Sequence, residues 1–457
     1  MHIALINTNR MRPPIAPIGL DYIAEALSAA GHLPRLLDLV WEENAQAAIE
    51  KFFANSSFAL VGMTLRNTDD CSYINCQTFV PAFIELVQWV RNNTDAPIVL
   101  GGVGFSVMPE KILSTTKSTW GIWGEGEFAI TDLATRLEEG RELGDLPSLI
   151  WSNNGKWKRN PPRWRSLGDL PLMTRSWVDN PRYFRDGGQA GFETKRGCSA
   201  DCIYCADPAA KGKTVRVRPP AAVVDELENL VEQGITALHT CDGEFNVPAW
   251  HALEICREVT RRGLGSKMRW YAYCSPAGFS QELASSMRRA GCVGIDFGAD
   301  NGNEEMLRSL GRDFSPSDIM NCTRWAKEEG MAVMLDLLLG GPGETRESLE
   351  QTVELMKRAD PDRVGVTLGV RIYPGTALDA RLGSGDRLNP AFYLEPRIAP
   401  YVFELLGNLI GDDRRFLFFD PSRPEQNYNY NSNQRLVDAI QKGYRGAFWD
   451  ILRTYNP

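Results

Sequence analysis

Long apolar runs, histidines and basic clusters are scarce in this sequence of 457 residues. No stretch of about 18 apolar residues free of charge occurs, and the opening MHIALINTNR lacks the basic and apolar segments of a secretory signal peptide. We therefore expect a cytoplasmic protein without a membrane partner. The formal net charge of −8 gives no general electrostatic reason to bind nucleic acid, and we expect none as a partner.

Cysteines are too dilute for a disulfide framework, because only ten occur in the whole chain. Only Cys198, Cys202 and Cys205 form a tight cluster, with three thiols inside eight residues. No further CxxC or HxxxH pair follows to complete a regular zinc site, so zinc is the less favoured metal for these three thiols.

The chain has 43% hydrophobic and 24% charged residues, which is typical of a globular protein, and its length allows two or three domains. Residues 1–150 alternate short apolar runs with amphipathic stretches, and this rhythm predicts an α/β domain with a doubly wound parallel sheet. Glycine-rich turns at 101–104 and 124–127 follow two of these runs. Ligands of open α/β sheets usually lie at such turns.

The rest of the chain divides into three further parts. Residues 151–188, rich in Pro, Trp and Arg, predict a linker. Residues 189–385 resume the alternation in six βα units, which predict a partial barrel of the TIM type, with an open doubly wound sheet as the alternative. Residues 386–457 predict a small, mostly helical C-terminal region that covers the substrate. The barrel strands are expected near 192–195, 235–241, 269–274, 293–298, 332–338 and 364–370.

The three clustered cysteines directly follow the strand-like GFETKRG, so a single loop could fold their thiolates around a compact metal centre. Three ligands for a four-iron cluster leave one iron open. The segment resembles the CxxxCxxC signature of the radical S-adenosylmethionine (SAM) superfamily, and the likeness extends over roughly residues 190–380. It implies a 4Fe-4S cluster on Cys198, Cys202 and Cys205 whose open iron chelates SAM for reductive cleavage. Tyr204 stands where that superfamily usually has an aromatic residue.

The same resemblance implies a set of SAM contacts at the ends of the later strands. Asp242, Gly243 and Glu244 resemble the GGE-type motif that receives the SAM amino group, although Asp242 replaces its first glycine. A surface turn is the alternative for this segment. A helix cap is the alternative for Asp300, the candidate for ribose binding. The full set implied is Tyr204, Asp242, Gly243, Glu244, Ser275, Asp300 and Arg312.

The first domain, placed before such a core, resembles the cobalamin-binding domain of the cobalamin-dependent radical SAM enzyme family. The likeness rests on residues 17–20, the turn at 101–104 with Pro109 and Glu110 after it, and the turn at 124–127. The residues that it implies as cobalamin contacts are Thr64, Leu65, Arg66, Gly101, Gly102, Gly124, Glu125 and Gly126.

Histidine cannot supply a lower cobalt ligand in the usual way, because none of the four histidines lies in a DxHxxG loop. Our hypothesis is that Arg66, in the segment 64–67, faces the lower side of the corrin and disfavours a water ligand. The alternative is that Arg66 is an ion-pairing residue on the surface.

This resemblance implies a methyltransferase that passes a methyl group from SAM through cobalamin to a small natural-product or aromatic amino-acid-like substrate. The segments TLRNTDD and GAFWDILR are similar to those of methylases of the tryptophan 2-C-methyltransferase type. An external electron donor such as flavodoxin or ferredoxin is also implied. Candidates for an aromatic substrate pocket, which could equally be packing residues, are Tyr428, Tyr430, Tyr444 and Trp449.

Three other functions remain open at this point. A cobalamin-dependent radical SAM cyclase or rearranging enzyme would share every motif above. A methylthiotransferase needs a further cluster on N-terminal cysteines, of which only Cys71 and Cys76 are present. A non-catalytic cobalamin- or zinc-binding module would use the same ligands without chemistry.

Overall fold

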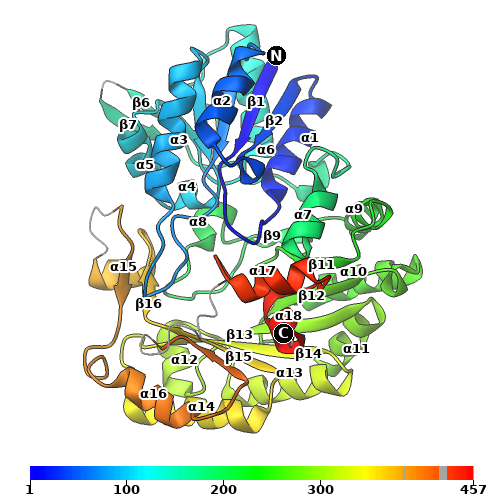
Figure 1. The fold of residues 1–457 in the computed structure, drawn as a ribbon, viewed down its shortest axis with the longest axis vertical. Helices are drawn as coiled ribbons and strands as arrows, with labels where there is room; N and C mark the ends of the chain where they lie inside the picture. Colours follow the sequence, from blue (N-terminus) through cyan, green and yellow to red (C-terminus); the bar gives the residue numbers. More distant parts are fainter. Residues whose placement is uncertain (154, 384–387, 421–429, 456–457) are drawn as a thin grey trace.

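The computed structural model describes residues 1–153, 155–383, 388–420 and 430–455, and it contains two seven-stranded sheets, one above the other in Figure 1. Within this described part, no helix has the length and apolar composition needed to span a bilayer. The two sheets correspond to the two α/β regions expected from the sequence.

The first sheet is the predicted doubly wound domain. Its five parallel strands have the order β2-β1-β3-β4-β5, and an antiparallel hairpin of β6 and β7 extends one edge. The strands are β1 (His2–Asn7), β2 (Leu33–Asp38), β3 (Leu60–Thr64), β4 (Ile98–Gly101), β5 (Trp120–Ile122), β6 (Leu149–Asn153) and β7 (Lys156–Arg159). Strand β7 lies in the segment predicted to be a linker, so this sheet continues past residue 150.

Helices cover both faces of the first sheet because alternate strand residues are apolar on both sides. Ile3 and Leu5 of β1 pack under α1 (Ile18–Ala29) and α6 (Glu127–Glu139). Ala4 and Ile6 pack under the helices of the opposite face. Those helices are α2 (Ala45–Ala54), α3 (Val80–Asn93) and α5 (Pro109–Thr116), with the short α4 (Val103–Val107) before the last of them.

The strand order reverses direction between β1 and β3, where open α/β sheets bind ligands beyond the carboxyl ends of their strands. The segments that follow these two strands, residues 8–17 and 65–79, therefore begin at the binding edge of the domain.

The second sheet is the predicted partial barrel, with seven parallel strands in the order β18-β15-β14-β13-β12-β11-β8. Six of them match the predicted strands. The seventh, β18, comes from the C-terminal region, where sequence patterning predicted helices. The strands are β8 (Ala190–Phe192), β11 (Ala237–Thr240), β12 (Arg269–Cys274), β13 (Cys292–Asp300), β14 (Ala332–Leu339), β15 (Arg363–Leu368) and β18 (Phe416–Phe418).

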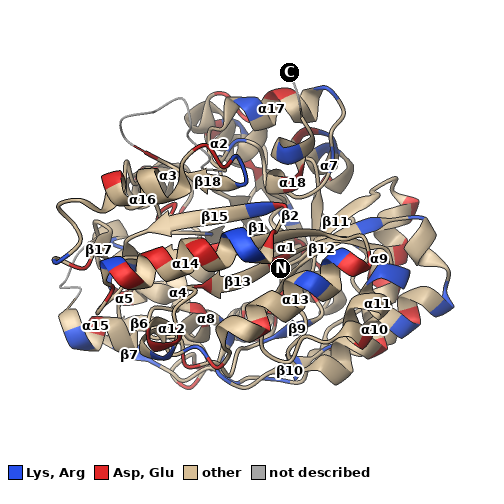
Figure 2. Ribbon diagram, turned by 90° about the horizontal axis from the view of Figure 1, so that it is seen from below, with Lys and Arg blue, Asp and Glu red and all other residues tan. Residues whose placement is uncertain are grey.

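Helices pack on the outer face of the barrel strands. In Figure 2, blue and red segments occur along helices such as α14 and α10, whereas the strands are mostly tan. On the inner face, Trp449 packs against Tyr271 and Met334 near one end of the strands, which leaves the other end available for a site. The helices between the barrel strands are α8 (Asp207–Lys211), α9 (Pro220–Glu232), α10 (Ala249–Arg261), α11 (Gln281–Arg289), α12 (Glu304–Leu310), α13 (Pro316–Glu328) and α14 (Arg346–Ala359).

Two small hairpins and the remaining helices complete the described part. The hairpins pair β9 (Lys195–Arg196) with β10 (Arg216–Val217), and β16 (Val370–Ile372) with β17 (Ala391–Tyr393). The helices are α7 (Asn180–Gly187), α15 (Ala377–Leu382), α16 (Val402–Ile410), α17 (Gln434–Gln441) and α18 (Phe448–Thr454).

A buried ionic cluster joins the first domain, the connecting segment and the barrel. Glu226 of α9 accepts hydrogen bonds from Tyr22 of α1 at 2.9 Å, from Arg175 at 2.7 Å and from Arg218 at 2.6 Å. Arg175 also donates to Asp21 of α1 at 2.8 Å. Losing one partner of such a buried cluster would leave an uncompensated charge, at a cost of about 3–5 kcal/mol. This cluster therefore holds the two sheets in one arrangement.

Candidate functional site

A cavity of about 790 Å³ lies between the two sheets, at the switch point of the first domain. It is also lined by the end of β11 and by Tyr273 of the barrel. Predicted site residues that line it are Thr64, Arg66, Gly101, Gly102, Gly124, Glu125, Gly126, Asp242 and Gly243. The structure thus brings most of the predicted cobalamin contacts and part of the predicted SAM motif to one space.

The backbone of the turn after β4 requires a glycine at position 102. Gly102 has a φ of +103°, and a Cβ there would overlap the carbonyl oxygen of Leu65. The Leu65 N–H donates to the Gly101 carbonyl at 2.8 Å, and the Leu65 carbonyl accepts from Gly104 N–H at 3.0 Å. Leu65 is buried and is not part of the cavity lining, so its contribution is to hold this turn against the end of β3.

Arg66 directly follows Leu65 and has an unusual environment for a cation. It lines the cavity, and its guanidinium donates to the sulfur of Met11 at 3.8 Å. Within the described residues it forms no ion pair with a carboxylate, and burial lowers the pKa of Arg66. The alternative of a surface ion-pairing residue is therefore wrong.

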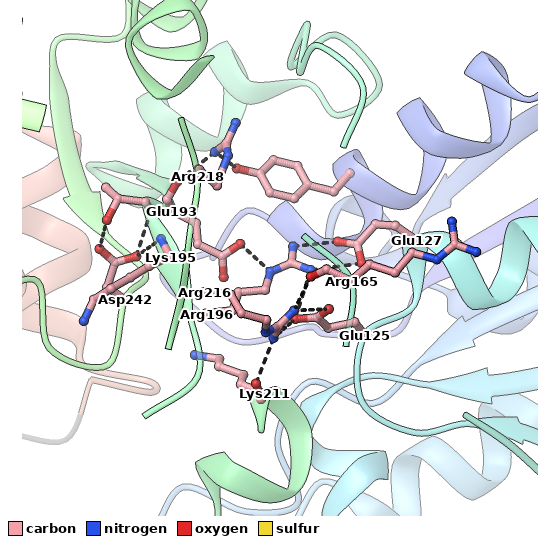
Figure 3. Close-up of polar contacts among 12 residues, drawn as sticks. Glu125, Glu127, Arg165, Glu193, Lys195, Arg196, Lys211, Arg216, Arg218 and Asp242 are labelled. Carbon is pink, nitrogen blue, oxygen red and sulfur yellow. Dashed lines mark hydrogen bonds and ion pairs between the residues drawn. The ribbon is translucent and has the colours of Figure 1, made fainter. Parts of the chain in front are cut away.

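A network of buried charges connects the Gly124 to Glu127 turn with the segment before the cysteines (Figure 3). Arg196 donates to Glu127 at 2.6 Å and 3.1 Å, and to Glu193 at 2.8 Å. Arg216 donates to Glu125 at 2.8 Å, and Glu125 also lies 3.7 Å from Arg196. The first domain and the cluster loop are therefore held together two residues before Cys198.

The loop that carries the cysteines is fixed at several backbone positions. Gly197 has a φ of +87°, and a Cβ there would overlap the carbonyl oxygen of Thr214. The Cys198 N–H donates to the Gly212 carbonyl at 3.2 Å, and the Cys205 N–H donates to the Cys202 carbonyl at 3.3 Å. All three thiols are free and half-buried.

The three thiols on one half-buried loop are a ligand set that fits a four-iron cluster with one open iron. Within the described residues no group of three His, Cys, Asp or Glu side chains is close enough to hold one metal ion. In a four-iron cluster each cysteine binds a different iron, so its ligands need not converge on a point. Burial raises the pKa of all three thiols, that of Cys205 to about 12, with the neighbouring Cys202 and Cys198 adding to the rise. Cluster binding must therefore release protons from this loop.

Next to Cys202, Arg312 contacts side chains that the resemblance implied as SAM contacts. It donates to the Cys202 sulfur at 2.8 Å and to Glu244 at 3.3 Å, and its Nε lies 3.3 Å from Asp300. Tyr204 donates to the same Asp300 carboxylate. Asn303, not Asp300, caps α12, so the helix-cap alternative for Asp300 is wrong.

Asp242 is buried, which rules out the surface-turn alternative, and both its oxygens are engaged. They accept from the Thr194 N–H at 2.8 Å, the Thr194 hydroxyl at 2.6 Å and the Lys195 N–H at 3.3 Å. Asp242 therefore positions the segment leading to the cysteines. A Cβ at Gly243 would fit without overlap, in ordinary van der Waals contact with the Asp207 carboxylate at 3.6 Å.

Ser275 lies apart from the cavity lining. Its side chain is buried, and its hydroxyl accepts a hydrogen bond from the Ala277 N–H at 3.2 Å. A contact of Ser275 with SAM remains a prediction.

Of the four aromatic residues predicted for a substrate pocket, Tyr430 lines the cavity. Trp449 is buried against Tyr271 at a ring distance of 5.9 Å, and Tyr444 packs on Tyr455 at 5.3 Å, so both are packing residues. Tyr428 lies outside the described residues. Sequence analysis missed His239 and Tyr273, which line the cavity from β11 and β12. Side chains alternate between the two faces of a strand, and both residues fall on the inward-facing positions, so this alternation could have identified them.

Arg196→Lys tests whether the charged network supports the cluster loop. Lysine keeps the positive charge but cannot donate to Glu127 and Glu193 in two directions. We expect about 10- to 100-fold weaker iron binding, as for other residues that orient metal ligands, measured as iron per chain after anaerobic reconstitution. Arg262→Lys, in an ion-pair group at the outer end of α10, is the matched control. Equal iron loading in the two variants would show that the network does not support the loop.

Comparison with known proteins agrees with this site. A radical SAM superfamily model matches residues 192–356, and a B12 binding domain model matches residues 5–134. The chain is 30% identical to a tryptophan 2-C-methyltransferase of Streptomyces laurentii, over 98% of this chain and 95% of that protein. It is 27% identical to an uncharacterized methyltransferase of Pyrococcus horikoshii, over 79% and 77% of the two chains.

Two solved structures of the radical SAM methyltransferase TsrM from Kitasatospora setae resemble this fold closely. One, with tryptophan substrate and the SAM analogue aza-SAM bound, has a TM-score of 0.91 and 30% identity, covering 99% of this chain and 97% of that one. The other, with cobalamin and a [4Fe-4S] cluster bound, has a TM-score of 0.89, 28% identity and the same coverage. With both domains matched and similarity over nearly its full length, the chain belongs to the cobalamin-dependent radical SAM enzyme family.

Proposed function

We propose that this protein transfers a methyl group from SAM, by way of cobalamin, to a carbon of a small aromatic amine or amino acid. The observation that carries the proposal is the cavity that the predicted cobalamin loops share with the barrel strand ends next to the cysteine loop. A methyl carrier and its acceptor must meet in one space that excludes bulk water.

Each cofactor of this family supplies a distinct part of the chemistry: the cluster supplies low-potential electrons, SAM supplies the methyl group, and cobalamin relays it. The protein's part is to bind and orient. Cys198, Cys202 and Cys205 hold the cluster, while the turns at 101–104 and 124–127 form the cobalamin side of the cavity. Arg312 orients Glu244 and Asp300, which are the acceptors for the polar groups of SAM.

An aromatic substrate is supported by the rings that line the cavity from the barrel side. His239 and Tyr273 lie 4.6 Å apart between ring centroids, and Tyr430 lines the same space. Burial lowers the pKa of His239 to about 4, so its ring is neutral near pH 7 and can stack on another ring without an added charge. The TsrM structure with tryptophan bound supports the same class of substrate.

The remaining parts of the proposal follow from this chemistry. A reduced cluster needs an external electron donor such as flavodoxin or ferredoxin, and the cytoplasm is the compartment that we propose. We assign cobalamin binding to residues 1–150, the radical SAM barrel to 189–385 and substrate covering to 386–457, with 151–188 between the first two.

Deuteromethyl-SAM tests the function directly. Anaerobic protein carrying cluster and cobalamin is incubated with a low-potential reductant, labelled SAM and tryptophan as the probe acceptor. We expect S-adenosylhomocysteine and a product heavier by one labelled methyl group, both detected by mass spectrometry. Cys205→Ser, which removes one cluster ligand, should form no labelled product. Label transfer at an equal rate without added cobalamin would contradict the proposal.

Arg66→Gln tests the hypothesis that Arg66 faces the lower side of the corrin. Because a guanidinium has no lone pair to offer and disfavours a water ligand, protein-bound Co(II) should lack a lower ligand in the parent protein. Glutamine removes the charge, and we expect a water-ligated Co(II) spectrum from electron paramagnetic resonance. Arg12→Gln, a change at a residue that donates to Val40 instead, is the control. A nitrogen-ligated Co(II) spectrum in the parent protein would refute the hypothesis.

A further inference from the structure

The inner face of the barrel contains two carboxylates that the proposed function does not use. On β13, Ile295 and Phe297 pack against the outer helices, so Asp296 between them points to the barrel interior. On β14, Leu335 and Leu337 pack outward, and Asp336 points inward in the same way. The two strands are neighbours in the sheet, with Asp296 opposite Met334 and Asp336 opposite Gly298. The two carboxylates therefore lie diagonally across the strand pair, within hydrogen-bonding reach of each other.

Several side chains on the inner face of the barrel are accessible at this level. Tyr273 is 40% exposed and Thr367 is also exposed, although both belong to strands inside the sheet, and Asp336 is half-buried. One layer further from the cavity, Tyr271 and Met334 close the interior together with Trp449. Tyr273 lines the cavity assigned to cobalamin and substrate, whereas Asp296 and Asp336 lie beyond its lining on the neighbouring strands.

No described residue forms an ion pair with either carboxylate. The Arg66 guanidinium is close enough to Tyr273 to lower its pKa, but it is not among the groups that shift the pKa of either acid. Asp296 is 2% exposed, and its Oδ1 has no hydrogen-bond partner among the described residues. Arg312, the cation at the next level, is already paired with Asp300 and Glu244. Gly365 on the adjacent strand keeps room for this arrangement, because a Cβ there would overlap the Asp336 carboxylate.

A carboxylate pair without a cation, here one buried and one half-buried, holds one proton and one negative charge. Burial raises the pKa of Asp336 to about 6, and burial together with the neighbouring Asp336 raises the pKa of Asp296 further. At pH 7 the pair therefore retains a negative charge that the described residues leave unbalanced. Such a charge is costly unless a ligand supplies the opposite one.

We propose that Asp296 and Asp336 form the subsite that binds a primary ammonium group of the substrate, with the substrate's aromatic ring against Tyr273 and His239. This inference rests on the proposed function for the class of substrate, and it adds which group of that substrate the barrel recognises. Tyr273 lies close enough to both carboxylates for their charges to raise its pKa, so one ligand can reach the ring and the acids together.

Tryptamine and 3-ethylindole separate the ammonium from the ring, because they differ only in the terminal amino group. Binding of each is measured calorimetrically to the parent protein loaded with cluster and cobalamin, and to Asp336→Asn and Asp296→Asn. Loss of one charge-assisted hydrogen bond corresponds to about a 10- to 100-fold change in affinity. We expect the parent to prefer tryptamine by about this factor, and both variants to lose the preference while keeping their affinity for 3-ethylindole.

Asp313→Asn is the control, since it removes the same charge from an exposed position near the barrel mouth, and it should keep the preference. Equal affinity of the parent for both ligands, no binding of either, or a preference retained in both variants would overturn the subsite. Cobalamin-dependent formation of S-adenosylhomocysteine, measured on the same parent preparation, reports on the proposed function separately. If S-adenosylhomocysteine forms but the parent protein binds tryptamine no more tightly than 3-ethylindole, the subsite proposal is wrong and the methyl-transfer proposal is supported.

Discussion

The contact between Arg196 and the Glu125 to Glu127 turn is the constraint on which the site depends. Arg196 stands two residues before the first cluster ligand, and Glu127 stands one residue after a turn glycine that lines the cavity. Because the guanidinium bonds Glu127 and Glu193 at the same time, the cobalamin side and the cluster side cannot move independently. Methyl transfer between two separately bound cofactors requires that kind of fixed separation.

Two groups of buried carboxylates near this contact differ in whether positively charged side chains compensate them. At the domain interface Glu226 meets two arginines and a tyrosine, so its charge is compensated. Inside the barrel, Asp296 and Asp336 meet no cation within the described residues. Proteins retain uncompensated buried polar groups mainly where a ligand completes them. The ionic cluster around Glu226 is therefore structural, while the Asp296–Asp336 pair is the proposed place for a ligand.

Much of this architecture could be predicted from the sequence, because strand length and alternation are local properties. The strands around Ile3 and Val333, and the cysteine loop, follow from patterns of adjacent residues. Strand β18 could not be predicted, since three residues of Phe-Leu-Phe are a strand only when β15 provides the partner. The role of Asp242 was also hidden: its bonds to Thr194 connect positions 48 residues apart. Trp449 stayed ambiguous because an aromatic side chain in a core and one in a pocket look alike in sequence.

We propose that cobalamin and the iron–sulfur cluster bind close together, because Arg196, two residues before Cys198, lines the same cavity as the predicted cobalamin loops. Electron paramagnetic resonance of Co(II) in protein that also carries the reduced cluster measures this most directly, because two unpaired spins that lie close together broaden each other's signals and speed their relaxation. We expect a broadened, fast-relaxing Co(II) signal that becomes narrow in the Cys205→Ser variant. A Co(II) signal that is the same with and without the reduced cluster would contradict it.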